Sequence, residues 1–144
     1  MAKEFDENRW FNLAVRGLLT EIEKCCTSKK EVTEDLLASI HTLFPTHSVT
    51  ALDLIDHQSV SLLTSPSGRK IYSCLGSLGT PYVICYTGFT CTCPSFRHNF
   101  NIENLWCKHL LALQLSLAMG VVQQKQVTEE IMMAMLNELV ICHE

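Results

Sequence analysis

The sequence predicts an α+β fold, in which N-terminal helices are followed by a small three-stranded antiparallel sheet and then by C-terminal helices. Two patterns support this class. Apolar residues recur at helical spacing in the first 57 residues and again after residue 107. Between these segments, residues 58–86 hold short runs rich in branched and aromatic side chains, separated by turns. We therefore expect three regions, 1–57, 58–120 and 121–144, that pack as one domain.

The N-terminal region is expected to contain three helices. The second helix ends at Pro45, because proline cannot continue a helix. Ser28 and Glu31 form a capping-box pattern ahead of this second helix, and Ser48 is the candidate cap of the third. The apolar stripes of the first two helices consist of Trp10, Phe11, Ala14, Val15, Leu18, Leu19 and Ile22, and of Leu36, Leu37, Ile40, Leu43 and Phe44.

The central region is expected to begin with an antiparallel meander. Residues 60–63, 71–75 and 82–86 have the composition of strands. The first two strands are joined at residues 65–68 by Ser-Pro-Ser-Gly, a sequence typical of a β-turn. A second turn at 76–81 leads into the third strand. A sheet this small is marginally stable alone in water, so it needs helices or a metal ion to stabilise it.

Two helices are expected after the sheet. Residues 108–119 carry apolar side chains on nearly every side, which is typical of a helix buried on more than one face, and Gly120 ends this helix. Thr128 caps the last helix. One interpretation of these apolar helices is a core that closes over the sheet. The composition, 47% hydrophobic and only 18% charged, supports a surface for a protein partner about equally well, and the family resemblance given below makes this surface the preferred interpretation. The candidate interface residues are Leu111, Leu115, Leu136 and Leu139.

The formal net charge of −4 is unevenly distributed along the chain. Residues 58–126 contain five Lys or Arg and a single acidic residue, whereas both flanking regions are acidic. A chance distribution of solvated charges explains this pattern equally well, so it does not establish nucleic-acid binding. We expect the nearby Phe96, Phe100 and Trp106 to pack a loop rather than to stack on bases. Because DNA phosphates are contacted by Lys and Arg, the candidate nucleic-acid contacts are Arg69, Lys70, Arg97 and Lys108.

The chain contains eight cysteines, an even number that raises the question of disulfides. Residues 1–7 lack the apolar stretch of a secretory signal, and no apolar run reaches the roughly 20 residues of a membrane span. We therefore expect a reducing compartment, in which the cysteines are free or bound to metal.

The sharpest pattern in the sequence consists of Cys91 and Cys93, then thirteen residues, then Cys107 and His109. Three thiolates and one imidazole complete a tetrahedral ligand set for Zn²⁺. The first pair follows the third strand and the second pair begins the helix at 108–119, so the metal would clamp a strand-to-helix junction. Because four protein ligands leave no open coordination position, we expect one structural zinc ion.

The cysteines and histidines allow other ligand assignments. His98, in the loop between the two pairs, is the main alternative to His109, and Cys85 is an alternative cysteine ligand. No nucleophile elbow, phosphate loop or pair of carboxylates accompanies the cysteines, so we do not expect an enzyme. The cysteines expected to be ordinary core or surface residues are Cys25, Cys26, Cys74, Cys85 and Cys142.

The pattern C-x-C…C-x-H resembles the SWIM-type zinc finger, with Ala112 at the place where an extended form of that motif has alanine. The resemblance extends beyond the finger to the small SWIM-domain subunit of the Shu complex, and it covers roughly residues 30–120. The segments that carry this longer resemblance are 51–56, 65–69, 93–96 and 107–112.

This resemblance implies a nuclear accessory factor of homologous recombination. It implies a RecA-like recombinase paralogue as an obligate or near-obligate partner, and assistance to the strand-exchange recombinase as it assembles on single-stranded DNA. The DNA would be reached through the complex, and neither a membrane nor a small-molecule substrate is expected. The finger alone is shared with ubiquitin-pathway and transposase-related proteins. An adapter for ubiquitin-pathway proteins and a stand-alone DNA-binding module are therefore the alternatives.

Overall fold

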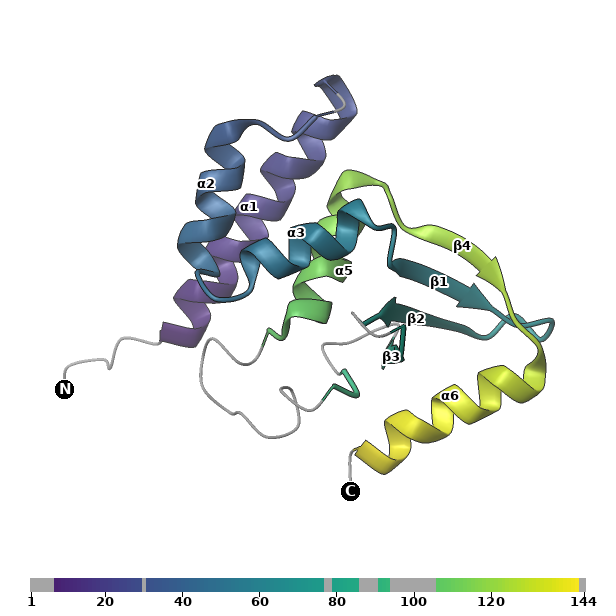
Figure 1. Ribbon diagram of the computed structural model, residues 1–144. Helices are drawn as coiled ribbons and strands as arrows, with labels where there is room; N and C mark the ends of the chain where they lie inside the picture. The colour runs from purple at the N-terminus through teal and green to yellow at the C-terminus, as the bar shows by residue number, and fades with distance from the viewer. Residues whose placement is uncertain (1–6, 30, 77–78, 86–90, 94–105, 143–144) are drawn as a thin grey trace.

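The computed structural model describes residues 7–29, 31–76, 79–85, 91–93 and 106–142 (Figure 1). Helices at both ends and a small sheet between them confirm the predicted α+β class. The elements in chain order are α1 (Glu7–Lys29), α2 (Glu34–Leu43), α3 (Ser48–Asp56), β1 (Val60–Thr64), β2 (Lys70–Leu75), β3 (Pro81–Ile84), α5 (Lys108–Met119), β4 (Gln123–Gln126) and α6 (Glu129–Cys142).

The sheet has four strands in the order β3-β2-β1-β4, and it is mixed rather than purely antiparallel. Strands β1, β2 and β3 form the predicted meander, with Val60 opposite Cys74. The prediction of three strands is corrected by β4, which runs parallel to β1 with Leu62 opposite Gln124. Its sequence, Gln-Gln-Lys-Gln, lacks the branched and aromatic residues by which strands are recognised. This edge strand therefore depends on its pairing with β1.

Successive side chains of a strand point to opposite faces of the sheet, and here both faces carry buried apolar side chains. Helices therefore cover both faces. One face packs against the cluster of α1, α2, α3 and α5, and the other face packs against α6, which lies apart from the remaining helices (Figure 1). The residues on the first face include Val60, Tyr72, Cys74 and Ile84, and those on the second are Leu63, Ile71 and Val83.

Helix α5 lies at the centre of the larger core, in contact with α1, α3 and the first two strands. Leu111 and Leu115 are only 1% and 0% exposed, because these elements cover them. On α6, Leu139 is buried and Leu136 half-buried against the sheet. The interpretation of Leu111, Leu115 and Leu139 as a partner surface is therefore corrected, whereas the partly exposed Leu136 stays a prediction. An all-round apolar helix indicates burial but not which chain buries it, and here the chain itself does so.

Two helix starts differ from the expected ones. Helix α2 begins after Thr33, whose hydroxyl accepts a hydrogen bond from the Leu36 N–H at 3.3 Å. Ser28 lies inside α1 instead, and its hydroxyl donates to a backbone carbonyl of that helix. Ser48 is the buried first residue of α3, and its hydroxyl lies 2.8 Å from Nδ1 of His41. The N-cap position of α3 is occupied by His47 instead, whose side chain makes no capping hydrogen bond.

Other helix boundaries agree with the sequence. Gly120 ends α5 in the left-handed conformation, with φ of 71°. The Thr128 hydroxyl accepts from the Ile131 N–H at 3.2 Å at the start of α6. Among the described helices, none combines the length and the apolar character that crossing a membrane requires.

Candidate metal centre

The first ligand pair is held against the end of β3. Ile84 pairs with Cys91 in an isolated antiparallel bridge. Thr92 forms two hydrogen bonds with Val83. Its N–H donates to the Val83 carbonyl at 3.1 Å, and its hydroxyl accepts from the Val83 N–H at 3.0 Å. These bonds fix the backbone between Cys91 and Cys93. The residue between the two cysteines therefore has a positioning role that the sequence pattern does not indicate.

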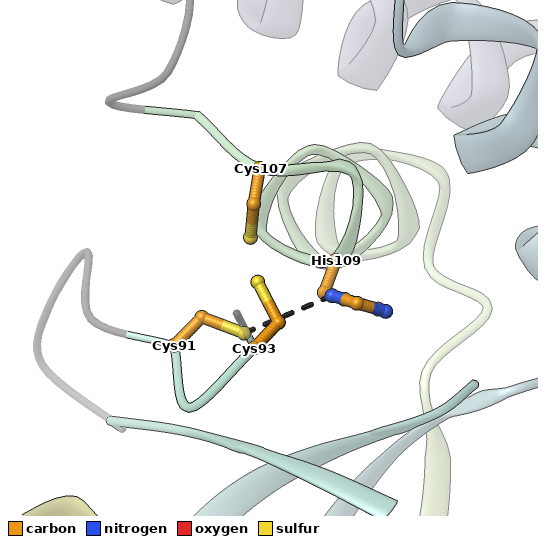
Figure 2. A group of neighbouring side chains, drawn as sticks. All are labelled: Cys91, Cys93, Cys107 and His109. Carbon is orange, nitrogen blue, oxygen red and sulfur yellow. Dashed lines mark hydrogen bonds between the residues drawn. The ribbon is translucent and has the colours of Figure 1, made fainter. Parts of the chain in front are cut away.

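The second ligand pair lies at the start of α5. Cys107 is the N-cap residue of this helix, with extended backbone angles, and its Sγ accepts from the Leu110 N–H at 3.4 Å. His109 follows in the first turn. Both side chains lie on the side of the helix that faces Cys91 and Cys93 (Figure 2).

All four predicted ligands meet in one buried cluster (Figure 2). Their ligand atoms lie within 4.8 Å of one another, and Sγ of Cys91 is 3.8 Å from Nδ1 of His109. Zn–S bonds of about 2.3 Å in a tetrahedral site place neighbouring sulfur atoms about 3.8 Å apart. The donor atoms and their spacing therefore fit one structural zinc ion.

The cluster gathers three thiols where water has little access. Contacts with Cys107 and Cys93, together with burial, raise the pKa of Cys91 far above its ordinary value. For Cys107, the contact with Cys91 lowers the pKa, whereas the contact with Cys93 and burial raise it. The raising effects are larger, and the pKa of Cys107 is about 12. Three buried thiols cannot all ionise side by side without a compensating cation, and zinc binds the thiolate form. The electrostatics of the cluster therefore favour a bound dication.

Two further residues position the imidazole of His109. The ring of Tyr82, on β3, lies over it, with ring centroids 4.4 Å apart and planes inclined by 35°. A Cβ atom at Gly76 would lie 2.7 Å from Cε2 of Tyr82, so glycine leaves the room that this tyrosine needs. The sequence does not mark either residue, because only the tertiary structure brings them to the metal site.

Of the remaining cysteines, Cys25, Cys26, Cys74 and Cys85 lie outside the cluster of ligands. Cys74 is the most deeply buried of them, and burial raises the pKa of its thiol to about 12. Cys85 packs against the sheet face that α6 covers. His98 and the side chain of Cys142 lie outside the described residues.

The predicted nucleic-acid contacts do not form one patch. Arg69 and Lys70 are exposed at the turn between β1 and β2. Lys108 lies near Leu75, at the far end of β2. The length of that strand, about 17 Å, separates the two groups. Arg97 lies outside the described residues.

The chain is similar in sequence to a zinc finger family and to several known proteins. Residues 90–117, which contain the four ligands and the fully buried Ala112, match the SWIM zinc finger family. Zinc finger SWIM domain-containing protein 7 of Danio rerio is 40% identical over 126 residues, which cover 83% of this chain and 87% of that protein. The protein of the same name from Homo sapiens is 36% identical over 118 residues, covering 81% and 84%. A homologue from Dictyostelium discoideum is 30% identical over 86 residues, covering 56% and 54%. No solved structure matches the chain.

Proposed function

The chain belongs to the family of zinc finger SWIM domain-containing protein 7, and on this basis we propose that it is a non-enzymatic, zinc-stabilised subunit of a Shu-type complex in homologous recombination. It pairs with a RecA-like recombinase paralogue in the nucleus and helps the recombinase assemble on single-stranded DNA. The observation that carries this proposal is the extent of the similarity. It covers 81–83% of the chain in two vertebrate relatives, well beyond the finger at residues 90–117.

The geometry of the metal site supports a structural role. Its four ligands come from two segments, residues 91–93 after β3 and residues 107–109 at the start of α5. A bound zinc ion supplies a cross-link between these segments, and four protein ligands leave it no open position for a catalytic water. The site therefore serves to hold the junction between β3 and α5 together.

Exposed apolar side chains on α1 support a partner surface there. Leu111 and Leu115 belong to the core of the chain itself, so the partner must contact other residues. Trp10 and Leu13 are both more than half exposed and lie three positions apart, on one side of the helix. Tryptophan is enriched among the residues that dominate binding energy at interfaces. We assign this pair to the contact with the recombinase paralogue.

DNA contact through the complex agrees with the charges on the chain. Lys125 on β4 lies opposite Leu63 of β1, so it joins Arg69 and Lys70 at one end of the sheet. Three cations on a chain of net charge −4 give weak attraction to phosphates. We therefore expect the isolated chain to bind single-stranded DNA weakly, and the assembled complex to bind it more tightly.

Tagging the full-length chain in the cells that produce it, followed by purification and mass spectrometry, tests the proposal. We expect a RecA-like paralogue in amounts comparable to the chain. Stoichiometric recovery of a ubiquitin ligase or conjugating enzyme would instead support the adapter alternative. Tight, salt-sensitive binding of single-stranded DNA by the pure chain would support the stand-alone DNA-binding alternative.

Matched variants sharpen this experiment. Joint replacement Trp10→Ala and Leu13→Ala should reduce recovery of the paralogue at least tenfold without loss of zinc, because the pair is exposed and distant from the ligands in sequence. Val49→Ala, a change at an exposed apolar side chain on α3, is the control and should retain the paralogue. Equal recovery with both variants would place the interface elsewhere.

A further inference from the structure

A pocket of about 400 Å³ lies next to the metal site, between α3, the end of β2 and the start of α5. Of the four metal ligands, only His109 lines it, so the pocket is distinct from the cluster of sulfur atoms. The lining residues that matter here are Asp53, Leu54, His57, Leu75, Lys108 and His109.

The histidine ligand presents an unsatisfied donor beside this pocket. Nδ1 of His109 faces Sγ of Cys91, and Nε2 lies on the other side of the ring, away from the cysteines (Figure 2). With Nδ1 on the metal, Nε2 must carry a proton and donate it to an acceptor. The residue is only 2% exposed, and no described residue accepts a hydrogen bond from Nε2. A buried donor is stabilised by an acceptor, and within the described part of the chain Nε2 has none, so this atom is available to a group that enters the pocket.

The charges around the pocket indicate what kind of group that is. Asp53 and His57 face each other at the rim, with Oδ1 and Nδ1 3.4 Å apart, and Nδ1 also lies 2.8 Å from the backbone carbonyl oxygen of Asp53. Lys108, by contrast, makes no ion pair with any described residue. Lys108 and His109 both line the pocket, and neither the ammonium group of Lys108 nor the Nε2–H of His109 has an acceptor among the described residues.

We propose that this pocket receives the carboxylate of an acidic side chain from a protein partner. One carboxylate oxygen accepts from Nε2–H of His109, and the carboxylate pairs with the ammonium group of Lys108. The apolar walls formed by Leu54 and Leu75 suit the methylene groups of a glutamate. A nucleic-acid phosphate suits the site less well, because a bulky phosphodiester is less able to reach a buried nitrogen. The proposal requires zinc on His109 but does not depend on the recombination role.

NMR titration of the zinc-loaded, ¹⁵N-labelled full chain tests this assignment. The probes are N-acetyl-glutamate methylamide, its glutamine counterpart of nearly identical shape, and methyl phosphate. We expect the glutamate probe to shift the Nε2–H resonance of His109 saturably, with at least tenfold tighter binding than either other probe. Equal shifts from glutamate and glutamine, the absence of saturation, or tighter binding of methyl phosphate would each overturn the proposal.

Two lysine variants provide a second test of the proposal. Lys108→Met keeps the aliphatic stem and should weaken the glutamate probe about tenfold, because a charged hydrogen-bond partner is lost. Lys24→Met, at an exposed side chain on α1, should leave its binding unchanged. Unchanged glutamate binding by Lys108→Met would contradict the proposal. The comparison of probes on the unaltered chain decides the question even if Lys108→Met loses zinc.

Discussion

Gly76 controls how closely the ring of Tyr82 approaches the imidazole of His109. A methyl group at this position would meet Cε2 of Tyr82 at 2.7 Å, so the ring must move away from the ligand that it covers. We expect Gly76→Ala to weaken zinc binding at least tenfold, as changes around metal-ligating histidines do. Competition with a chromogenic chelator measures this affinity.

A second glycine provides the control for this experiment. Gly17 lies in α1 with open space around its Cα, so Gly17→Ala should keep the zinc affinity. It should also stabilise the chain by about 0.5–1 kcal/mol, because alanine favours helix. Equal zinc affinities for the two variants would show that Tyr82 does not position His109.

Leu111 tests whether α5 is buried by the chain itself. Its side chain is 1% exposed, so Leu111→Ala should leave a cavity and lower the free energy of unfolding by about 2–5 kcal/mol. Leu117 lies on the same helix but is 43% exposed, and Leu117→Ala should cost less than about 1 kcal/mol. Denaturant unfolding of the zinc-loaded chain distinguishes the two. A small loss of unfolding free energy in Leu111→Ala would mean that the chain itself does not bury this side chain.

The residues of the metal site show how far sequence reasoning reaches. The spacing of two Cys/His pairs was sufficient to predict all four ligands, because zinc restricts both the donor atoms and their number. Thr92, Tyr82 and Gly76 could not be predicted in the same way. Their roles depend on contacts with β3 and α5 that exist only after folding.

At the scale of elements, the docking of α6 depends partly on Glu129. Its carboxylate accepts a hydrogen bond from the Ser67 N–H in the turn between β1 and β2. Hydrogen bonds from the Ser67 hydroxyl and N–H lower the pKa of Glu129 below its ordinary value of 4.5. A lowered pKa in the folded chain means that this stabilisation is complete above about pH 4.5 and is lost as the pH falls through the folded value.

The Glu129→Gln variant checks this contribution. The variant should unfold at a lower temperature than the unaltered chain near neutral pH, and the difference should shrink as the pH falls below 4.5. Loss of zinc in acid affects both chains, so the comparison rests on their difference. A difference that stays constant with pH would mean that the carboxylate is not the responsible group.

The elements also show where a sequence pattern is ambiguous. Helix α5 has its predicted bounds, because Gly120 in the left-handed conformation is a strong end signal. The sequence predicts Ser28 as the cap of α2, but Thr33 also offers a hydroxyl, and α1 continues past Ser28 to Lys29, so Thr33 is the cap. Strand β4 could not be predicted, since its polar residues become a strand only beside β1.

At the scale of the whole molecule, the larger core extends from the metal site to the N-terminal helices. Buried residues from α1, α2, α3 and α5 pack with one face of the sheet over a continuous cluster. The metal ligands lie where residues 91–93, which follow β3, meet the start of α5. Removal of zinc should therefore loosen this junction first and leave the N-terminal helices in place.

Hydrogen exchange before and after chelation measures this effect. We expect amides of β3, residues 91–93 and the first turn of α5 to lose protection at least tenfold, while α1 retains most of its protection. Cooperative unfolding of the entire chain on chelation would show that the helical core depends on the metal after all.

X-ray absorption spectroscopy at the zinc edge, on the purified full chain of known metal content, most directly tests whether three cysteines and one histidine hold a structural zinc ion. We expect one zinc per chain, with three sulfur neighbours at about 2.3 Å and one nitrogen neighbour at about 2.0–2.1 Å. His109→Ala should abolish the nitrogen signal or the metal itself. An oxygen ligand in the native spectrum, a set of four sulfurs, or full retention of the nitrogen signal in His109→Ala would contradict this assignment.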